Sequence, residues 1–164
     1  MSEVTSTRPL AAAIVERYAA AGATIATAES CTGGMVAAAL TDIAGSSAVF
    51  DRGFVTYSNA AKVAMLGVAE TTLAAHGAVS EETAREMAEG ARRNSGVDVA
   101  VSITGIAGPG GGSPGKPVGL VHFACTGPEG TRHREERFGD RDRAAIRQAS
   151  TIVALEMLLA ALPG

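Results

Sequence analysis

The stretch GSSAVFDRGFVTYSNAAK, residues 45–62, joins the main structural signals of the chain to its most reactive side chains. A glycine-led turn carries Ser46 and Ser47, an apolar and aromatic run follows as far as Tyr57, and Lys62 lies one helical turn further on. This order predicts a turn, a buried strand and the start of a helix. Lys62 then either lies on a solvated helix face or joins a hydroxyl and the phenol in a nucleophilic site. The stretch alone leaves both interpretations open.

Length and composition predict a single α/β domain. The chain has 164 residues, with 20 glycines, no tryptophan and 4% aromatic residues. A chain of this length buries about 70% of the surface that its unfolded form exposes. We therefore expect residues 1–164 to form one domain, with residues 1–8 flexible. So many small residues favour helices that pack closely on a sheet.

The charge and the cysteines exclude several classes of protein. A net charge of −3 argues against a general nucleic-acid binder, which usually carries a basic excess. We find no apolar run of the ~18 residues that a membrane span needs, and the N-terminus lacks the basic start of a secretory signal. Two cysteines, Cys31 and Cys125, make neither a disulfide framework nor a metal cluster. We expect a cytoplasmic protein with no metal, and with neither nucleic acid nor membrane as partner.

Helix-like and strand-like segments alternate along the chain, which predicts an α/β fold. We expect a three-layer α/β/α sandwich around a mostly parallel or mixed sheet of about five strands. Ser80 is a good N-terminal cap, and either Asp140 or Asp142 should cap the last helix. The predicted helices are 10–21, 35–43, 60–66, 69–75, 80–94 and the last helix, and the predicted strands are 23–28, 49–57, 97–103, 118–125 and 132–138.

Two further polar turns follow predicted strands. The first reads ESCTGG, residues 29–34, between a strand and a helix, a geometry in which backbone N–H groups receive anions. Its glycines also suit a simple helix cap with close packing. The second begins at Thr104-Gly105. If the strands are neighbours, Ser30 and Thr32, the Ser47–Lys62 groups, and Ser102 with Thr104 converge on one cleft at the strand ends.

The glycine-rich segment 105–117 resembles a phosphate-binding P-loop only superficially. Gly110, Gly115 and Lys116 fit G-x-x-x-x-G-K, but Pro117 stands where a magnesium-binding Ser or Thr is needed. A strand also follows, where the motif requires a helix. The segment is therefore predicted to be a loop beside the ligand site.

The available side chains favour hydrolysis by a serine and a lysine. We find no His/Asp pair near a serine and no metal-ligand spacing, so a serine nucleophile needs another base. A lysine whose pKa is depressed by burial can accept the proton, and Tyr57 can assist. This predicts a metal-free and cofactor-free Ser–Lys–Tyr amidohydrolase. Chemistry alone does not choose between the adjacent serines.

Several blocks, in order and at compatible spacing, resemble the CinA C-terminal domain family, which includes nicotinamide-nucleotide amidases. The similarity covers about residues 23 to 160. The blocks are TAESCTGG (27–34), DIAGSSAVFDRGFVTYSNAAK (42–62), HGAVSEET (76–83), SITGIAGPGGG (102–112), KPVG (116–119) and GDRDRAAIRQA (139–149).

The resemblance implies an activity and assigns residues to it. The activity is hydrolysis of nicotinamide mononucleotide to nicotinic acid mononucleotide and ammonia, a step of pyridine-nucleotide salvage, without a metal. Ser47 would be the nucleophile, Lys62 the base and Tyr57 the proton relay. A homodimer is expected, and the activity of the extra N-terminal domain of longer members is not transferred. The implied substrate-binding residues are Ser30, Thr32, Gly33, Gly34, Thr104, Gly105 and Arg141.

Two alternatives remain at this point. One is a non-catalytic binding or regulatory module linked to competence, against which the intact Ser47, Tyr57 and Lys62 argue. The other is an amidase that acts on a different amide-bearing nucleotide.

Overall fold

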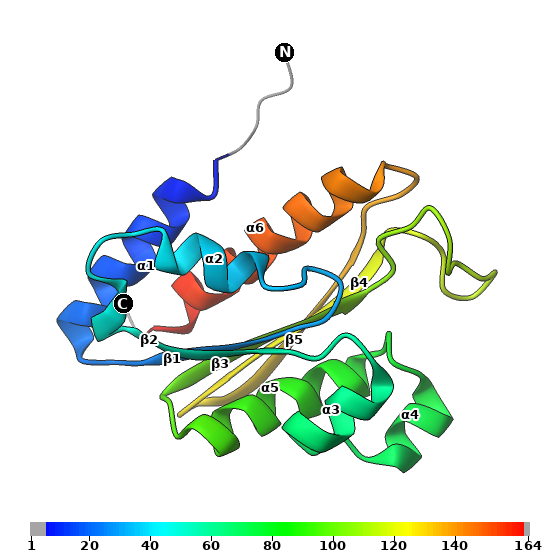
Figure 1. The fold of residues 1–164 in the computed structure, drawn as a ribbon, viewed down its shortest axis with the longest axis horizontal. Helices are drawn as coiled ribbons and strands as arrows, with labels where there is room; N and C mark the ends of the chain where they lie inside the picture. The colour runs from blue at the N-terminus through cyan, green and yellow to red at the C-terminus, as the bar shows by residue number, and fades with distance from the viewer. Residues whose placement is uncertain (1–5, 163–164) are drawn as a thin grey trace.

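The computed structural model describes residues 6–162 and forms one five-stranded sheet with helices on both faces (Figure 1). The predicted three-layer α/β/α architecture is confirmed. The strands are β1 (Ile25–Glu29), β2 (Phe50–Val55), β3 (Val99–Gly105), β4 (Leu120–Gly127) and β5 (Gly130–Arg137). The helices are α1 (Arg8–Ala21), α2 (Met35–Thr41), α3 (Asn59–Leu66), α4 (Glu70–His76), α5 (Glu81–Ser95) and α6 (Arg143–Ala161), with a short 3-10 turn, η1 (Ser46–Ala48), before β2.

The sheet is mixed, with strand order β2-β1-β3-β4-β5. β1 pairs in parallel with both β2 and β3, whereas β3–β4 and β4–β5 are antiparallel. β1, β2 and β3 therefore end at the same edge of the sheet. The glycine-rich connection from β3 to β4 begins at that edge too, so the polar turns that follow these strands lie together, as expected of an α/β ligand site.

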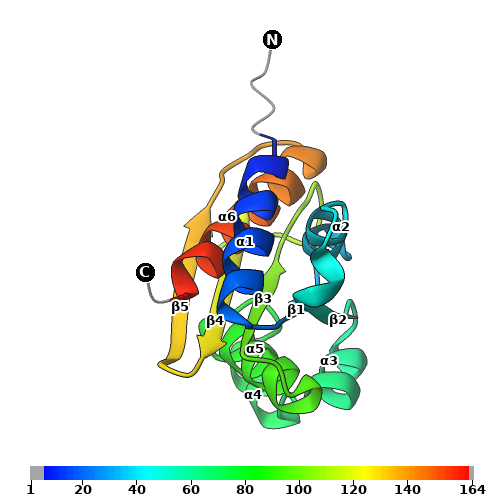
Figure 2. The same cartoon turned by 90° about the vertical axis from the view of Figure 1, so that its left-hand side faces the viewer.

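The two faces of the sheet carry side chains of different size. Helices α1, α2 and α6 cover one face, and α3, α4 and α5 lie on the other (Figures 1 and 2). The strands present larger residues such as Val101, Ile103 and Phe123 to the first layer. Toward α5 they present mainly Ala26, Ala28, Ala100 and Ala124. Small side chains let α5 approach the sheet closely, as the composition predicted.

Gly90 shows how tight the packing of the second layer is. A Cβ at this position of α5 would lie 1.9 Å from the carbonyl oxygen of Leu66 at the end of α3. Only glycine allows the two helices to approach this closely. Through this contact α5 holds α3 in place, and α3 carries Lys62.

Helix α6 is the long apolar helix of the first layer. By length and composition alone it is apolar enough to cross a membrane. In this fold its apolar face packs against α1 and the sheet, and the hydroxyl of Tyr18 in α1 donates a 2.7 Å hydrogen bond to the carbonyl of Leu158. The packing accounts for the composition of the helix.

One expectation is corrected here. The strand of the 45–62 stretch, β2, is an exposed edge strand and not a buried one, because only β1 pairs with it. Residues 1–5 of the segment expected to be flexible lie outside the described residues, but Arg8 begins α1 and pairs with Asp42. Lys116 of the glycine-rich loop donates a hydrogen bond to the carbonyl of His76, which fastens that loop to the end of α4.

Candidate active site

Lys62 is buried at the carboxyl edge of the sheet. The Ser58 hydroxyl caps α3 by accepting from the N–H of Ala61, and one turn later the Lys62 side chain points inward and is only 1% exposed. Its Nζ donates to the carbonyl oxygens of Thr56 at 2.9 Å and Tyr57 at 3.5 Å. Burial lowers the pKa of the Lys62 amine, because desolvation disfavours the charged form. The lysine is therefore not on a solvated helix face.

Ser30 completes the environment of this amine. Its Oγ lies 3.1 Å from Lys62 Nζ, and the side chain is buried beside the end of β1. The neighbouring Cys31 also borders the cleft, but burial raises the pKa of its thiol to about 11. At neutral pH that thiol stays protonated, which leaves the Ser30 hydroxyl as the nucleophile in contact with a base.

A buried carboxylate fixes the turn that carries Ser30. Glu29, the last residue of β1, accepts hydrogen bonds from Thr32 Oγ1 at 2.6 Å, Val36 N at 2.9 Å and Ala37 N at 3.1 Å. Two of these donors are free amides in the first turn of α2, where a carboxylate is favoured. Glu29 thus holds the turn and the helix together. Glu29 was not among the predicted site residues, although a carboxylate just before a helix start is a signal in the sequence for such a role.

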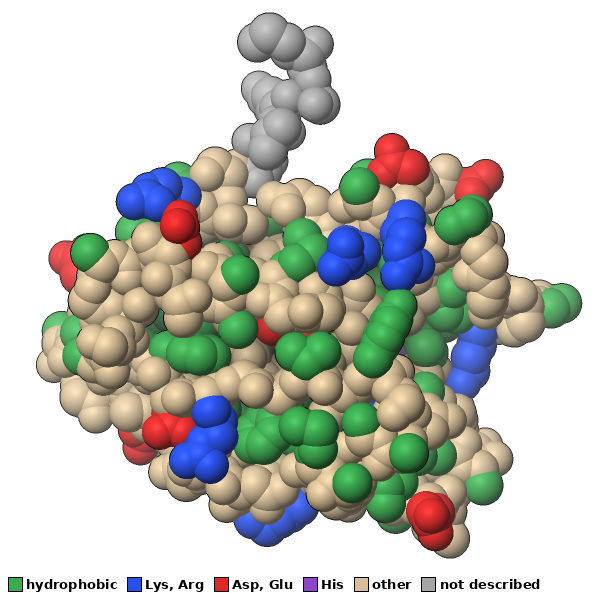
Figure 3. Space-filling view, in the orientation of Figure 1, with side chains coloured by type: hydrophobic (Ala, Val, Ile, Leu, Met, Phe, Trp, Pro, Cys, Tyr) green, Lys and Arg blue, Asp and Glu red, His purple; other side chains and the backbone are tan. Residues whose placement is uncertain are grey.

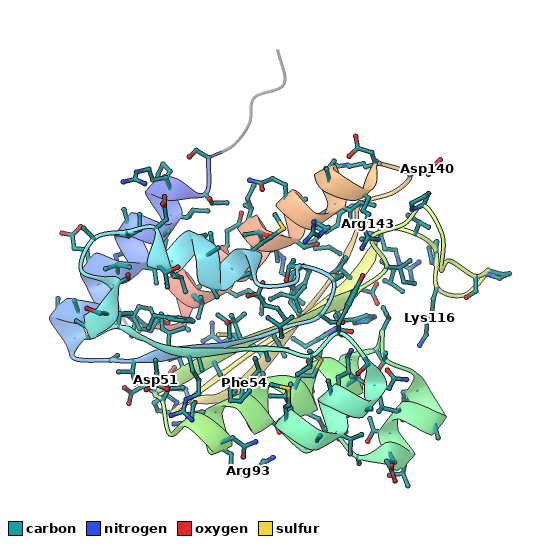
Figure 4. All side chains as sticks on the ribbon, viewed as in Figure 1. Asp51, Phe54, Arg93, Lys116, Asp140 and Arg143 are labelled. Atoms are coloured by element: carbon teal, nitrogen blue, oxygen red, sulfur yellow. The ribbon has the colours of Figure 1, made fainter. Side chains whose placement is uncertain are left out.

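Tyr57 lies at the mouth of the site. Its side chain is 59% exposed, and its hydroxyl accepts a 2.9 Å hydrogen bond from Arg143 at the start of α6. Arg143 also donates to the carbonyl of Gly108 in the glycine-rich loop at 2.8 Å. Figure 4 shows Arg143 beside that loop. One guanidinium therefore ties together three segments that are distant in the sequence.

These groups surround one cleft with a volume of about 270 Å³. The residues that line it come from every polar turn at this edge of the sheet. They are Ser30, Cys31, Tyr57, Asn59, Lys62, Ala78, Val79, Thr104, Gly105, Ile106, Ala107, Gly108, Gly110, Gly111 and Arg143. A cleft of similar volume, about 260 Å³, lies between the β4–β5 hairpin and the end of α6. It contains no paired nucleophile and base, so the chemistry points to the first cleft.

The predicted binding residues fall into two groups. Ser30, Thr104 and Gly105 line the cleft, and a Cβ on Gly105 would meet Val121 at 2.6 Å. The Thr104 hydroxyl donates to the carbonyl of Ala78 at 2.7 Å, so its role is to join two walls of the cleft. Thr32, Gly33 and Gly34 lie behind the lining, in the turn that Glu29 and Arg147 hold.

The chain does not bring Ser47 to Tyr57 and Lys62. Ser47 lies in η1 before β2 begins, whereas the other two follow the end of that strand. A strand of this length spans roughly 17–20 Å. Ser47 is exposed beside the start of β2, at the opposite end of that strand from the cleft, and it does not line the cleft. Closeness in sequence was misleading, because an extended strand separates its two ends.

Arg141 is also not at the site. It is exposed, and its guanidinium lies 5.7 Å from the ring centre of Phe138. Arg143 reaches the cleft instead because it follows the Asp142 cap and belongs to the first turn of α6. Arg147, one turn further, donates to the carbonyls of Cys31 and Thr32. The four-residue spacing of the two arginines on one helix face was the signal that sequence reasoning missed.

Fold and site together define a three-layer α/β protein with a buried Ser–Lys pair at the carboxyl edge of its sheet. The family model of the CinA C-terminal domain matches residues 7–162, and the chain belongs to that family. The resemblance found in the sequence motifs is thereby confirmed.

Relatives of two lengths match the chain. The nicotinamide-nucleotide amidohydrolase PncC of Escherichia coli (strain K12) is 60% identical over 141 residues, which are 85% of this chain and 84% of that protein. A CinA-like protein of Anaeromyxobacter dehalogenans (strain 2CP-C) is 56% identical over 91% of this chain. The chain spans only 36% of the length of that relative.

Solved structures share the same fold. The competence/damage inducible protein CihA from Agrobacterium tumefaciens has a TM-score of 0.93 and 55% identity, with 94% of each chain covered. A CinA superfamily protein from Escherichia coli has a TM-score of 0.92 at 34% identity, covering 99% of this chain and 94% of that one.

Proposed function

We propose that the protein hydrolyses the carboxamide of nicotinamide mononucleotide, with Ser30 as nucleophile and Lys62 as base. The observation that carries this proposal is the 3.1 Å contact between Ser30 Oγ and the amine of a lysine that is 1% exposed. The name of the PncC relative, 60% identical, supplies the substrate class. In this proposal Ser30 takes the role that the sequence motifs suggested for Ser47.

The neutral amine that burial favours can act as a base toward Ser30. In the proposed neutral form, two protons of the amine go to the carbonyls of Thr56 and Tyr57. The lone pair of the amine then accepts the proton of the Ser30 hydroxyl, whose Oγ lies 3.1 Å from Nζ. As Oγ attacks the carboxamide carbon, Lys62 takes the hydroxyl proton and passes it to the leaving nitrogen. The C–N bond breaks and ammonia departs. Water then attacks the acyl-enzyme, gives a proton to Lys62, and releases the acid as the Ser30 hydroxyl is restored.

The oxyanion of this reaction needs donors beside Ser30. The N–H of Cys31 donates to no other residue among residues 6–162, and it belongs to the residue after the nucleophile, a position that supplies this donor in other hydrolases. Preorganised donors of this kind are worth about 3–4 kcal/mol of transition-state stabilisation each. Tyr57, at the mouth, assists in orienting the substrate together with Asn59.

We assign the 5′-phosphate of the substrate to Arg143. Its guanidinium lies at the mouth of the cleft, where an anion can approach from solvent. The turn at Thr32–Gly34 suits the phosphate less, because its residues do not line the cleft. Arginine binds phosphate through two parallel hydrogen bonds, which fixes the orientation of the mononucleotide.

The experiment that tests this function is release of ammonia from nicotinamide mononucleotide by the purified protein, with and without a chelator. We expect activity in both, and loss of activity in Ser30→Ala and Lys62→Met. Ser113→Ala, a hydroxyl on the exposed loop, is the matched control and should keep full activity. Full activity in Ser30→Ala would overturn the assignment of Ser30 as the nucleophile.

Nicotinamide riboside and free nicotinamide complete the substrate panel. Inactivity on all three compounds would favour the binding or regulatory module, and activity without the phosphate would favour another amide-bearing substrate. In the proposed role the acid product returns to pyridine-nucleotide synthesis in the cytoplasm. The free, buried thiols of Cys31 and Cys125 fit a reducing compartment.

A further inference from the structure

Two histidines lie between the β4–β5 hairpin and α5. The rings of His122 on β4 and His133 on β5 stack with their centres 5.1 Å apart, and His122 Nδ1 lies 2.9 Å from His133 Nε2. Their side chains are only 9% and 15% exposed. Almost no histidine surface is visible on the face of the molecule that Figure 3 shows. At 2.9 Å one of the two nitrogens must donate a proton to the other.

A carboxylate lies at each outer end of this pair. Glu135 stands opposite His122 in the β4–β5 ladder, and its Oε1 lies 3.7 Å from His122 Nε2. Glu81 belongs to the first turn of α5, and its Oε1 lies 3.6 Å from His133 Nδ1. The four side chains therefore form a continuous chain of titratable groups, which runs from the hairpin to the start of α5.

Other charged groups from the neighbouring elements face this chain. Arg137 on β5 donates to Glu135 Oε2 at 3.3 Å, which leaves Oε1 toward the histidine. Arg85 on α5 donates to Glu81 Oε2 at 2.8 Å, with the same result. The glycine-rich loop, α4 and α5 add three more groups to the cleft beside the first histidine: Lys116, His76 and Glu82. Figure 4 shows Lys116 pointing from the loop toward the layer of α4.

The four ring nitrogens of the pair fit three protons. Two neutral rings carry two protons, so one carboxylate would face a bare ring nitrogen. Two charged rings carry four protons, which sets N–H against N–H across the 2.9 Å contact. With three protons, the inner contact is one hydrogen bond and each outer nitrogen presents an N–H to a carboxylate. The geometry therefore fits a pair that holds a single positive charge.

His122 is the ring that stays neutral. Burial lowers the pKa of His122, and the charge of the adjacent His133 lowers it further. In the neutral ring Nδ1 accepts the hydrogen bond from His133 Nε2, and the one proton of the ring is on Nε2, toward Glu135. His133 then carries the charge, and its Nδ1–H faces Glu81. This ion pair joins β5 to the first turn of α5.

The start of α5 connects the pair to the candidate active site. Ser80 caps α5, and the two residues before it, Ala78 and Val79, line the Ser–Lys cleft. We propose that His122 and His133 form a pH-sensitive lock, which holds one charge and fastens the start of α5, with this wall of the cleft, to the β4–β5 hairpin.

Acidification should open this lock. His122 Nδ1 then takes a proton from water and no longer accepts a hydrogen bond from His133. Two charged rings in contact repel each other, and the ion pair with Glu81 no longer holds the hairpin against α5 in the same position. The start of α5 therefore loosens when His122 gains its second proton, and it tightens again when that proton leaves.

Nitrogen NMR of the histidine rings tests the shared charge without any activity. The chain has three histidines, so substituting each with glutamine assigns the ring signals. At about pH 6, just below the ordinary histidine pKa, we expect His133 to carry two protons and His122 to carry one, on Nε2. His133→Gln should raise the pKa of His122 by more than about one unit, because it removes the like charge.

His76 is the control in the same protein. It is half-exposed on α4, and its Nδ1 lies 3.6 Å from Glu82. His76→Gln should leave the signals of the other two rings unchanged. Both rings of the pair charged, or both neutral, at about pH 6 would overturn the lock. An unchanged pKa of His122 in His133→Gln would overturn it too.

Hydrogen exchange tests whether the lock holds α5. The amides of residues 84–86 donate to carbonyls at the start of the helix, among them Ala84 N to Ser80 O at 3.0 Å. After correction for the intrinsic effect of pH, their protection should fall roughly tenfold as His122 gains its second proton, the effect of one lost ion pair or hydrogen bond.

His122→Gln is the matched variant for this measurement. Its amide stays neutral and can still accept from His133, so protection of residues 84–86 should not fall over the same pH range. The amides of residues 150–155 in α6, on the other face of the sheet, should respond to pH in neither protein. An equal fall in native protein and His122→Gln would overturn the lock.

The effect on the cleft rests on the proposed function. Protonation of Lys62 also lowers ammonia release at low pH, so the informative quantity is the activity of His122→Gln divided by that of the native protein. This ratio should increase as pH falls through the titration of His122, and the ratio for His76→Gln should stay constant. A constant ratio for His122→Gln would overturn the connection to the cleft. A native protein that releases no ammonia would overturn the proposed function, and the NMR and exchange results would then judge the lock alone.

Discussion

Lys62 Nζ lies 3.1 Å from Ser30 Oγ, although 32 residues separate them in the chain. The contact exists because β1 and β2 are parallel neighbours, so the residues that follow each strand meet at one edge. The amine is buried and its other partners are backbone carbonyls, which accept hydrogen bonds without adding negative charge. A lysine in this setting is prepared to act as a base.

The activity should rise with pH through the pKa of Lys62. Burial lowers that pKa, so the neutral amine becomes available at lower pH than for an exposed lysine. As pH falls below the lowered pKa, Lys62 gains a proton and kcat/KM should fall in proportion to the neutral fraction. The measurement is a pH profile of kcat/KM for ammonia release. A profile that does not change from acidic to alkaline pH would contradict the role of Lys62.

The same shift predicts how stability depends on pH. Between the lowered pKa of the folded state and the normal lysine value, the unfolded state binds more protons, so the free energy of unfolding should rise with pH. Lys62→Met should remove this dependence, since it removes the titrating group. Urea unfolding of both proteins at several pH values from 7 to 10 compares the slopes. Equal slopes of unfolding free energy against pH in the two proteins would show that Lys62 does not cause the pH dependence.

Arg143→Met should raise KM for the mononucleotide more than for the riboside. The guanidinium is the proposed phosphate partner and also donates to Tyr57 Oη and the Gly108 carbonyl. Loss of a charge-assisted hydrogen bond to the phosphate should raise KM for the mononucleotide roughly ten- to a hundredfold. Arg141→Met is the matched control, because Arg141 lies over Phe138 and away from the cleft. An equal rise in KM for both substrates would place the phosphate elsewhere.

Glu29→Gln should lower both stability and kcat. The amide has one acceptor oxygen where the carboxylate offers two, and its NH₂ group would face the N–H of Val36 or Ala37. Leaving a buried donor unpaired costs about 1–3 kcal/mol. Urea unfolding gives the stability, and kcat reports the position of Ser30 in the turn. Unchanged values of both would refute the proposed positioning.

Gly90→Ala should destabilise the fold by about 3 kcal/mol, at the upper end for overpacking. The new methyl group would overlap the Leu66 carbonyl and push α3 away from α5. Gly115→Ala is the control, because a Cβ there has nothing within 4 Å. Thermal and urea unfolding compare the two variants. Equal stability of the two variants would contradict this prediction, because it would mean that α3 and α5 move apart at no cost in free energy.

Local patterns determined much of this protein. The hydrophobic periodicity and the caps at Ser80 and Asp142 placed helices close to where they occur, because a cap acts only on amides two or three residues away. Alternation of strands and helices predicted the layers. The motif blocks identified the family. Tyr57 and Lys62, predicted to be site residues, both line one cleft.

The tertiary structure alone decided which partners these residues have. Ser47 is nearer to Lys62 in sequence than Ser30 is. Strand β2 nevertheless separates the two, because Ser47 precedes its start and Lys62 follows its end. Arg143 enters the cleft and Arg141 does not, because the direction of each side chain is set by where α6 begins. Strand pairing and helix direction are long-range properties, fixed by packing across the whole domain. They determined which serine contacts the lysine within the chain.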